Sequence, residues 1–376
     1  MKMKARARKR LITWLLIAFV SLGIHYYVMI LSQQIIQGHF SFSGLLHLIH
    51  TRLTEPGDAV RYLDIAKNGY VREGENAINL VFYPLYPLLI RLFSILTGNL
   101  AFSGVLISQA SYAGASILMY ELLKIDHTEK EAWYGVLLLA LHPFSVFVMG
   151  IYTEGLFLLL TIGCLYLLRK QKYPAAGIVG FFAALCRTQG MLLIFPAAYE
   201  LIVCRLGKEK RKFHPSDLSV LLIPAGFGVY LLINAALHGN PFQFLQYEAG
   251  DPWFQTSQWI GRNISLQFLL AHEYEGLEWV IYYVQIILYF LALGILFFGI
   301  WKKERMSELL YGGAYLGFTY LSGWMISGGR YMLGCVPLFI ILAGIKNEMV
   351  RKVLLLAMCL FHFAYSLFFY IGYSIM

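Results

Sequence analysis

Four charged side chains, two acidic and two basic, are the first candidates for chemistry in this sequence. Asp58 lies in TEPGDAVRYLDIAKNGY, Glu154 in LHPFSVFVMGIYTEGLFLLL, Arg187 in CRTQG and Arg330 in SGGRYMLGCVPLF. An ionisable group is costly in an uncharged stretch such as the one around Glu154, so a functional or paired role is the first hypothesis there. A carboxylate can take a proton from a hydroxyl group, and an arginine can hold a phosphate with its planar fork.

Asp58 is expected to begin a short helix. Thr54 can cap that helix, Pro56 suits its first turn, an acidic residue suits the positive end of the helix dipole, and Gly69 would end it. In one reading the dipole keeps Asp58 ionised as a general base at the membrane surface, within reach of a lipid-borne substrate. In the other, which spacing alone favours, Asp58 only stabilises the helix start. Asp64 is a second candidate in the middle of the same helix.

Glu154 opens the helix that follows a break at His142 and Pro143. It could bind sugar hydroxyls, orient an acceptor or hold a basic partner. His142 is either a donor to a ligand or a satisfied buried histidine. Tyr152, two residues before Glu154, is a further candidate for substrate binding.

Arg187 falls at an expected break between two short helices, where irregular backbone must be surrounded by protein or a watery cavity. It would either pair with a carboxylate such as Glu154 or clamp a phosphate. Arg330, with Tyr331 beside it, offers a second anion site, and the alternative is an arginine that snorkels to the interface.

The elements that must position these residues are membrane helices. Of the 376 residues, 59% are hydrophobic and 14% charged, and this composition excludes a water-soluble protein. The alternating ten-residue segments of an outer-membrane barrel are absent from the sequence. We therefore predict an all-α polytopic membrane protein, with residues 1–376 forming a single domain.

Positive charges indicate the topology. With about eleven crossings, 22 of the 30 lysines and arginines fall in segments that share the side of the N-terminus, which the positive-inside rule assigns to the cytoplasm. Two long loops, 37–100 and 238–278, then face away from the cytoplasm and hold most of the polar chemistry. The excess of positive charge is thus explained by topology, and nucleic acid is not an expected partner.

Two apolar runs decide whether the number of crossings before each later loop is odd or even, and therefore on which side of the membrane that loop lies. Residues 174–204 would span about 46 Å as one helix, well beyond the hydrocarbon core of about 30 Å. We therefore expect two short helices that meet near Arg187. Residues 80–97 contain Pro84 and Pro87, which indicates an interfacial or re-entrant helix within the first outer loop.

These motifs together resemble the PIG-V family, membrane mannosyltransferases with the GT-C architecture that add the second mannose in GPI-anchor synthesis, and especially their bacterial relatives. The resemblance extends over about residues 57–340. It is carried, in the family's order, by GDAVRYLDIAKNGY with FYPLYPLL, HPFSVFVMGIYTEGLF, RTQG, GNPFQF followed by Trp259, and RYMLGCVPLF.

The resemblance implies an inverting transfer of mannose from a polyprenyl-phosphate donor, on the outer face of the membrane, to a glycan, lipid or protein acceptor. The compact length predicts that this membrane is a plasma membrane. The family's first-loop aspartate falls on Asp58, its YTE-type glutamate on Glu154 and the arginine of its R-x-x-G motif on Arg187. The family typically has tryptophan before the aspartate, where this chain has Gly57, so either the acceptor pocket or the rigidity of the loop is expected to differ. Some GT-C enzymes use a divalent metal, but the first loop has no DxD motif, and we expect none here.

Two other classes of function remain open. One is a GT-C glycosyltransferase that acts on protein, lipid A or a wall polymer. The other is a membrane transporter or flippase, although such proteins generally display internal repeats and charged pairs at the midplane, whereas the polar residues here collect toward one face.

Overall fold

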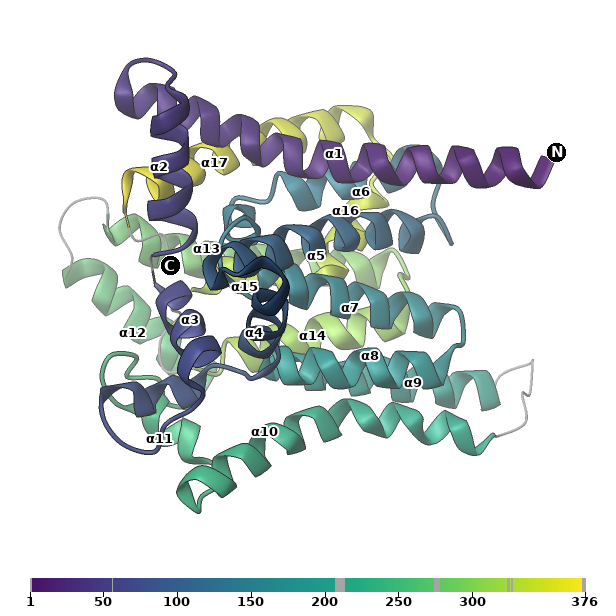
Figure 1. The fold of residues 1–376 in the computed structure, drawn as a ribbon. Coiled ribbons are helices and arrows are strands. Elements are labelled where there is room, and N and C mark those ends of the chain that lie inside the picture. The colour runs from purple at the N-terminus through teal and green to yellow at the C-terminus, as the bar shows by residue number, and fades with distance from the viewer. Residues whose placement is uncertain are drawn as a thin grey trace.

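The computed structural model of the chain describes residues 2–55, 57–206, 214–273, 278–322, 325 and 327–373. Within these ranges all regular elements are helices (Figure 1), which confirms the predicted all-α fold class. In chain order they are α1 (Lys2–Gln37), α2 (Phe42–Leu53), α3 (Asp58–Asn68), η1 (Glu75–Val81), α4 (Leu85–Thr97), α5 (Leu100–Leu123), α6 (Glu129–Ala140), η2 (Ser145–Val148), α7 (Glu154–Arg169), α8 (Tyr173–Cys186), η3 (Thr188–Leu193), α9 (Ile194–Leu206), η4 (Pro215–Leu221), α10 (Leu222–His238), α11 (Gln243–Ala249), α12 (Ile260–Glu273), α13 (Glu278–Trp301), α14 (Met306–Thr319), α15 (Gly328–Gly334), α16 (Val336–Ala343) and α17 (Glu348–Ile371).

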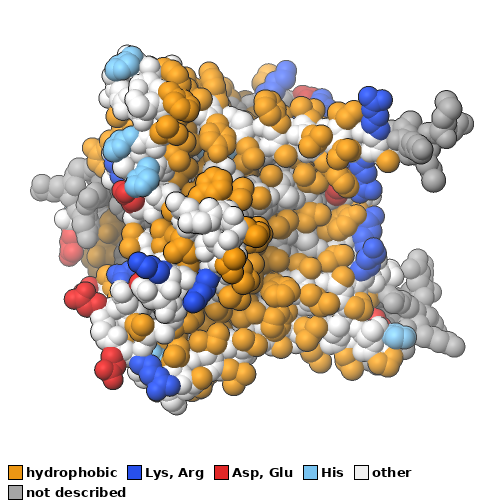
Figure 2. Space-filling view, viewed as in Figure 1, with side chains coloured by type: hydrophobic (Ala, Val, Ile, Leu, Met, Phe, Trp, Pro, Cys, Tyr) orange, Lys and Arg blue, Asp and Glu red, His pale blue; other side chains and the backbone are white. Residues whose placement is uncertain are grey.

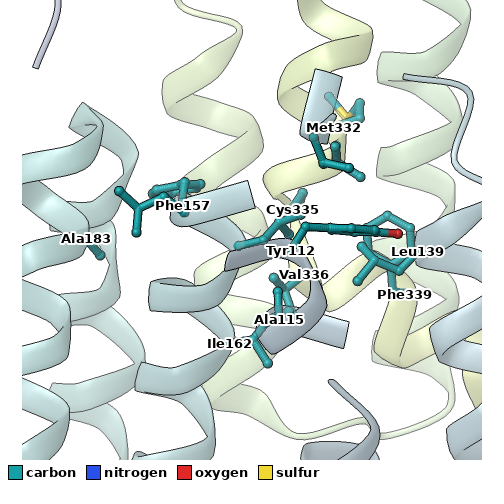
Figure 3. Close-up of a cluster of buried hydrophobic side chains, with 14 of the residues drawn as sticks. Tyr112, Ala115, Leu139, Phe157, Ile162, Ala183, Met332, Cys335, Val336 and Phe339 are labelled. Atoms are coloured by element: carbon teal, nitrogen blue, oxygen red, sulfur yellow. The ribbon is translucent and has the colours of Figure 1, made fainter. Parts of the chain in front are cut away.

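The longer helices run side by side and form a bundle (Figure 1). α5 packs against α7, and α8 packs against both α7 and α10. Figure 3 shows the buried apolar contacts between them, with Tyr112 of α5, Phe157 and Ile162 of α7, and Val336 and Phe339 of α16. The bundle therefore has a continuous core formed by helices from both halves of the chain.

Helices long and apolar enough to cross a membrane are present. The described residues contain five of them, within α1, α5, η4–α10, α13 and α17, or six if the bent pair η1 and α4 is one span. The space-filling view shows apolar side chains along the flank of the bundle (Figure 2). A multi-pass membrane protein is thus supported, whereas the predicted count of about eleven crossings is not confirmed.

The two apolar runs on which the predicted topology depends, 174–204 and 80–97, are both interrupted in the structure. α8 ends at Cys186 and η3 begins at Thr188, with Arg187 extended between them (φ −156°, ψ 151°). This confirms the expected break at Arg187. η1 and α4 are bent by 108° across the residues before Leu85, a geometry of either a broken span or a re-entrant loop.

Segments expected to share the N-terminal side do lie together, at what we call the basic end of the bundle. Ion pairs join them: Arg169 contacts Asp126 and Glu308, and Lys130 lies 2.8 Å from Glu348. Lys and Arg side chains line this end at the right of Figure 2. The expected cluster at 208–212 lies outside the described residues.

The opposite end carries the short helices α2, α3, α4, α11 and α12 (Figure 1), and we call it the short-helix end. Here one prediction was wrong in detail. Thr54 does not cap α3: its hydroxyl donates to the carbonyl of His50 at the end of α2. Gly57 takes the N-cap position with φ of +58°, a left-handed conformation that favours glycine. Gly69 ends the helix as predicted, and Pro56 lies outside the described residues.

Candidate active site

Arg330 is the centre of a buried ionic cluster at the short-helix end. Its Nε donates a hydrogen bond to Oε1 of Glu154, and its Nη2 lies 2.7 Å from Oδ2 of Asp58. The guanidinium also lies over two aromatic rings, 4.9 Å from the centroid of Phe147 and 4.8 Å from that of Tyr152. One arginine in α15 thus links the start of α3 to the start of α7.

Glu154 joins the second arginine to this cluster. Nη1 of Arg187 donates to the same Oε1 atom at 3.0 Å, so that one carboxylate oxygen receives two guanidinium groups. The other oxygen, Oε2, is buried and has no hydrogen-bond partner among the described residues. Because Glu154 is the first residue of α7, the positive end of the helix dipole also favours its negative charge.

Close packing around the helix break places Arg187. A Cβ atom on Gly190 would come within 2.2 Å of the backbone of Ala183, so only glycine lets η3 fold back against α8. Thr188 shares a 2.6 Å hydrogen bond with Tyr83, which ties the break to the segment before α4. The guanidinium of Arg187 then lies 4.8 Å from the ring centroid of Tyr331. The spacing of the R-T-Q-G motif therefore has a physical reason.

The four charged residues differ in their contact with solvent. The side chain of Asp58 is 23% exposed, against 2% for Glu154, 5% for Arg330 and 11% for Arg187. With two guanidinium groups and two carboxylates, these four residues have a formal net charge of zero. Asp58 is thus the member that a solvent-borne or lipid-borne group can reach most easily.

The structure brings together six of the seven candidate residues from the sequence, because Tyr152 and Tyr331 supply rings against the two arginines. The seventh, His142, is buried elsewhere. Its Nδ1 accepts a bond from the backbone N–H of Phe144, and its ring packs edge-on against Phe339. This environment is that of a satisfied core histidine, so its expected place in the substrate site is not supported.

Two residues near the cluster had not been singled out from the sequence. Phe147 lies under Arg330, and Phe157 lies 5.7 Å from the guanidinium of Arg187. A phenylalanine in a chain with 27 of them carries no signal of its own. In the part of the chain that the structure describes, no three His, Cys, Asp or Glu side chains gather as a metal site.

Comparisons with known proteins agree with the motifs. The family model described as mannosyltransferase (PIG-V) matches residues 8–205, a range that holds Asp58, Glu154 and Arg187. GPI mannosyltransferase 2 of Schizosaccharomyces pombe is 27% identical over 222 residues, covering 57% of this chain and 45% of that protein. Its counterpart from Yarrowia lipolytica is 27% identical over 155 residues, covering 41% and 38%.

Human GPI alpha-1,6-mannosyltransferase 2 is 30% identical over 148 residues, which cover 36% of this chain and 29% of that protein. Each alignment thus spans less than half the length of the curated relative. Among solved structures, the apo oligosaccharyltransferase of Archaeoglobus fulgidus aligns with a TM-score of 0.44 and 12% identity, over 91% of this chain and 56% of that one.

Proposed function

The chain belongs to the PIG-V family of mannosyltransferases, and we propose that it transfers a mannose-type sugar from a polyprenyl-phosphate donor to an acceptor hydroxyl at the short-helix end. The observation that carries the proposal is the cluster of Asp58, Glu154, Arg187 and Arg330. It sets a partly exposed carboxylate, Asp58, against Arg330 and links a second arginine, Arg187, to Arg330 through Glu154. A base and two cations are groups that such a transfer uses.

Asp58 acts as the general base in this proposal. It takes the proton of the acceptor hydroxyl while that oxygen attacks the anomeric carbon of the sugar from the side opposite the phosphate. The configuration at that carbon is therefore inverted. A sugar phosphate already carries a good leaving group, so the reaction needs no general acid.

Arg187 and Arg330 hold the phosphate of the donor. Charge develops on the phosphate oxygen as the bond to the sugar breaks, and buried guanidinium groups stabilise that charge better than water would. Glu154 fixes the two arginines relative to each other through its Oε1 atom. The prenyl chain would lie in the surrounding lipid.

We place the site on the extracytoplasmic face of a plasma membrane, with the N-terminus in the cytoplasm. The support is the gathering of Lys and Arg segments at the basic end (Figure 2), because such segments stay in the cytoplasm by the positive-inside rule. The acceptor is then a glycan, a lipid or a protein exposed on that outer face.

The decisive experiment incubates the purified full-length protein with labelled polyprenyl-phosphate mannose and a membrane extract, and identifies the product that acquires label. We expect a covalently mannosylated product that is absent with Asp58→Asn. Uptake of the donor into sealed vesicles without any covalent transfer would instead establish a transporter.

A further inference from the structure

Arg330 is shared between two carboxylates of very different accessibility. It bonds Glu154, whose side chain is 2% exposed, and contacts Asp58, which is 23% exposed. The contact with Glu154 is reinforced by Arg187 on the same oxygen, at 3.0 Å. Asp58 has no second arginine within ion-pair distance among the described residues. The contact between Arg330 and Asp58 is therefore the one that can be broken.

The charge balance makes this contact important for phosphate binding. With Asp58 ionised, the two guanidinium groups are matched by two carboxylates, so the arginines hold the donor phosphate in a site with no net charge, and its binding is weaker than in a site with a net positive charge. If Asp58 carries a proton, the net charge of these four residues becomes +1, and the ion pair between Nη2 of Arg330 and Asp58 is lost. The affinity of the site for an anion thus depends on the protonation of the base.

We propose that Arg330 couples proton transfer to phosphate departure, an inference that rests on the function proposed above. The acceptor O–H bond breaks and its proton goes to Asp58, while the acceptor oxygen bonds the anomeric carbon. The bond from that carbon to the phosphate oxygen breaks, and its electron pair stays on the prenyl phosphate. Neutralised Asp58 releases Nη2 of Arg330, which turns to the phosphate as its second negative charge appears.

The same contact then resets the site. Asp58, whose side chain is 23% exposed, returns its proton to water and recaptures Arg330. The phosphate loses one of its cationic partners, and the prenyl phosphate is released. An arginine suits this task because its planar fork can serve two acceptors at once, whereas a lysine is a single point charge.

Asp58→Asn imitates the protonated base and tests the coupling directly. The probe is farnesyl phosphate, titrated into the purified full-length protein in detergent, with farnesol as the control for the prenyl chain. We expect Asp58→Asn to bind farnesyl phosphate about tenfold more tightly than wild type, equivalent to about 1.4 kcal/mol, with farnesol binding unchanged. Asp64→Asn is the matched control, because Asp64 lies on the same helix and is held by Asn68 and Asn79.

A double-mutant cycle assigns the gain to Arg330. In the Arg330→Gln background, Asp58→Asn should give no tighter binding. If Arg330→Gln does not fold, Arg330→Lys serves instead, and there the gain should fall below about threefold, since one ammonium cannot replace the shared fork.

The coupling is overturned if folded Asp58→Asn binds farnesyl phosphate no more tightly than wild type, or if its gain persists without Arg330. These failures differ from failure of the proposed function. An Asp58→Asn protein that still transfers mannose at the wild-type rate would refute Asp58 as the base. An inactive Asp58→Asn protein without the binding gain would refute only the coupling.

Discussion

Replacing Glu154 with glutamine should separate the positioning of the arginines from the stability of the bundle. The chain contains a matched control at the basic end. Oε1 of Glu308 accepts two hydrogen bonds from Arg169, at 3.1 Å and 2.5 Å, and its Oε2 is buried without a partner in the described residues. Oε1 of Glu154 likewise accepts two guanidinium hydrogen bonds, one each from Arg187 and Arg330, and its Oε2 is also buried without a partner in the described residues.

Both substitutions remove the charge of a buried carboxylate and leave a neutral oxygen that still accepts hydrogen bonds. Removing one partner of a buried ion pair costs about 3–5 kcal/mol, and the retained amide oxygen places Glu154→Gln and Glu308→Gln at about 3 kcal/mol each. Thermal unfolding in detergent should therefore shift downward by similar amounts in the two variants.

Their effects on transfer should differ. In Glu154→Gln the two arginines no longer share one anion, and a displacement of about 1 Å near the reacting atoms can cost about a hundredfold in rate. We expect kcat to fall by about that factor while KM for the donor does not rise, because both guanidinium groups remain and the loss of a negative charge beside them favours an anion. Glu308→Gln should keep kcat within about threefold of wild type.

Initial rates over a range of donor concentrations, at a temperature where both variants are folded, provide the measurement. Equal losses of kcat in the two variants would mean that stability alone explains the effect. A loss in Glu154→Gln carried entirely by a higher KM would mean that Glu154 contacts the donor itself and does not act through the arginines.

Three further predictions concern single side chains. Asp58→Asn should lower the transfer rate by about 10²–10⁴-fold, while Asp64→Asn retains it, and an active Asp58→Asn enzyme would contradict the assignment. Arg187→Ala should raise KM for the donor by about ten- to a hundredfold, since a hydrogen bond to a charged group contributes about 1.5–3 kcal/mol, and unchanged donor kinetics would remove it from the site. Burial raises the pKa of Glu248 in α11 to about 7, so the folded protein holds a proton there that the unfolded chain releases near pH 4.3. The free energy of unfolding of the wild-type protein should thus fall as pH rises from about 4.5 to 7. Over that interval the melting temperature of Glu248→Gln should rise relative to that of wild type. A difference in melting temperature that does not change with pH would contradict this reasoning.

Much of the fold was predictable because lipid imposes strong limits on a sequence. Apolar composition sufficed for the all-α class, and excess length predicted the break at Arg187. The number of crossings was less accessible, since a continuous apolar run does not reveal internal breaks. Residues 132–150 are almost wholly apolar, yet α6 ends at Ala140 and the short helix η2 follows at Ser145–Val148. Residues 331–345 are also apolar, yet they are divided between α15 and α16 at Cys335.

Site residues were easier to find than their partners. Charged groups in apolar surroundings are rare enough to be noticed singly, but a pairing depends on how distant segments pack. The sequence left Glu154 open between sugar hydroxyls, an acceptor and a basic partner, and the fold supplies two arginines. Contact between Asp58 and Arg330 was not foreseen at all. His142 had the same appearance in the sequence, yet its ring lies in the aromatic core.

Discontinuities in the helices explain how the four charged residues can meet. Asp58 and Glu154 are the first residues of α3 and α7, Arg187 separates α8 from η3, and Arg330 lies in the first turn of the short helix α15. A continuous helix would direct such side chains along its flank, toward lipid or a neighbouring helix. At a break, the chain can turn a side chain toward the interior of the bundle, and backbone freed by the break is tolerated only where protein or water surrounds it. The breaks and the buried charges therefore require each other, because the cluster gives the interrupted helices a polar interior while the interruptions give the cluster its geometry.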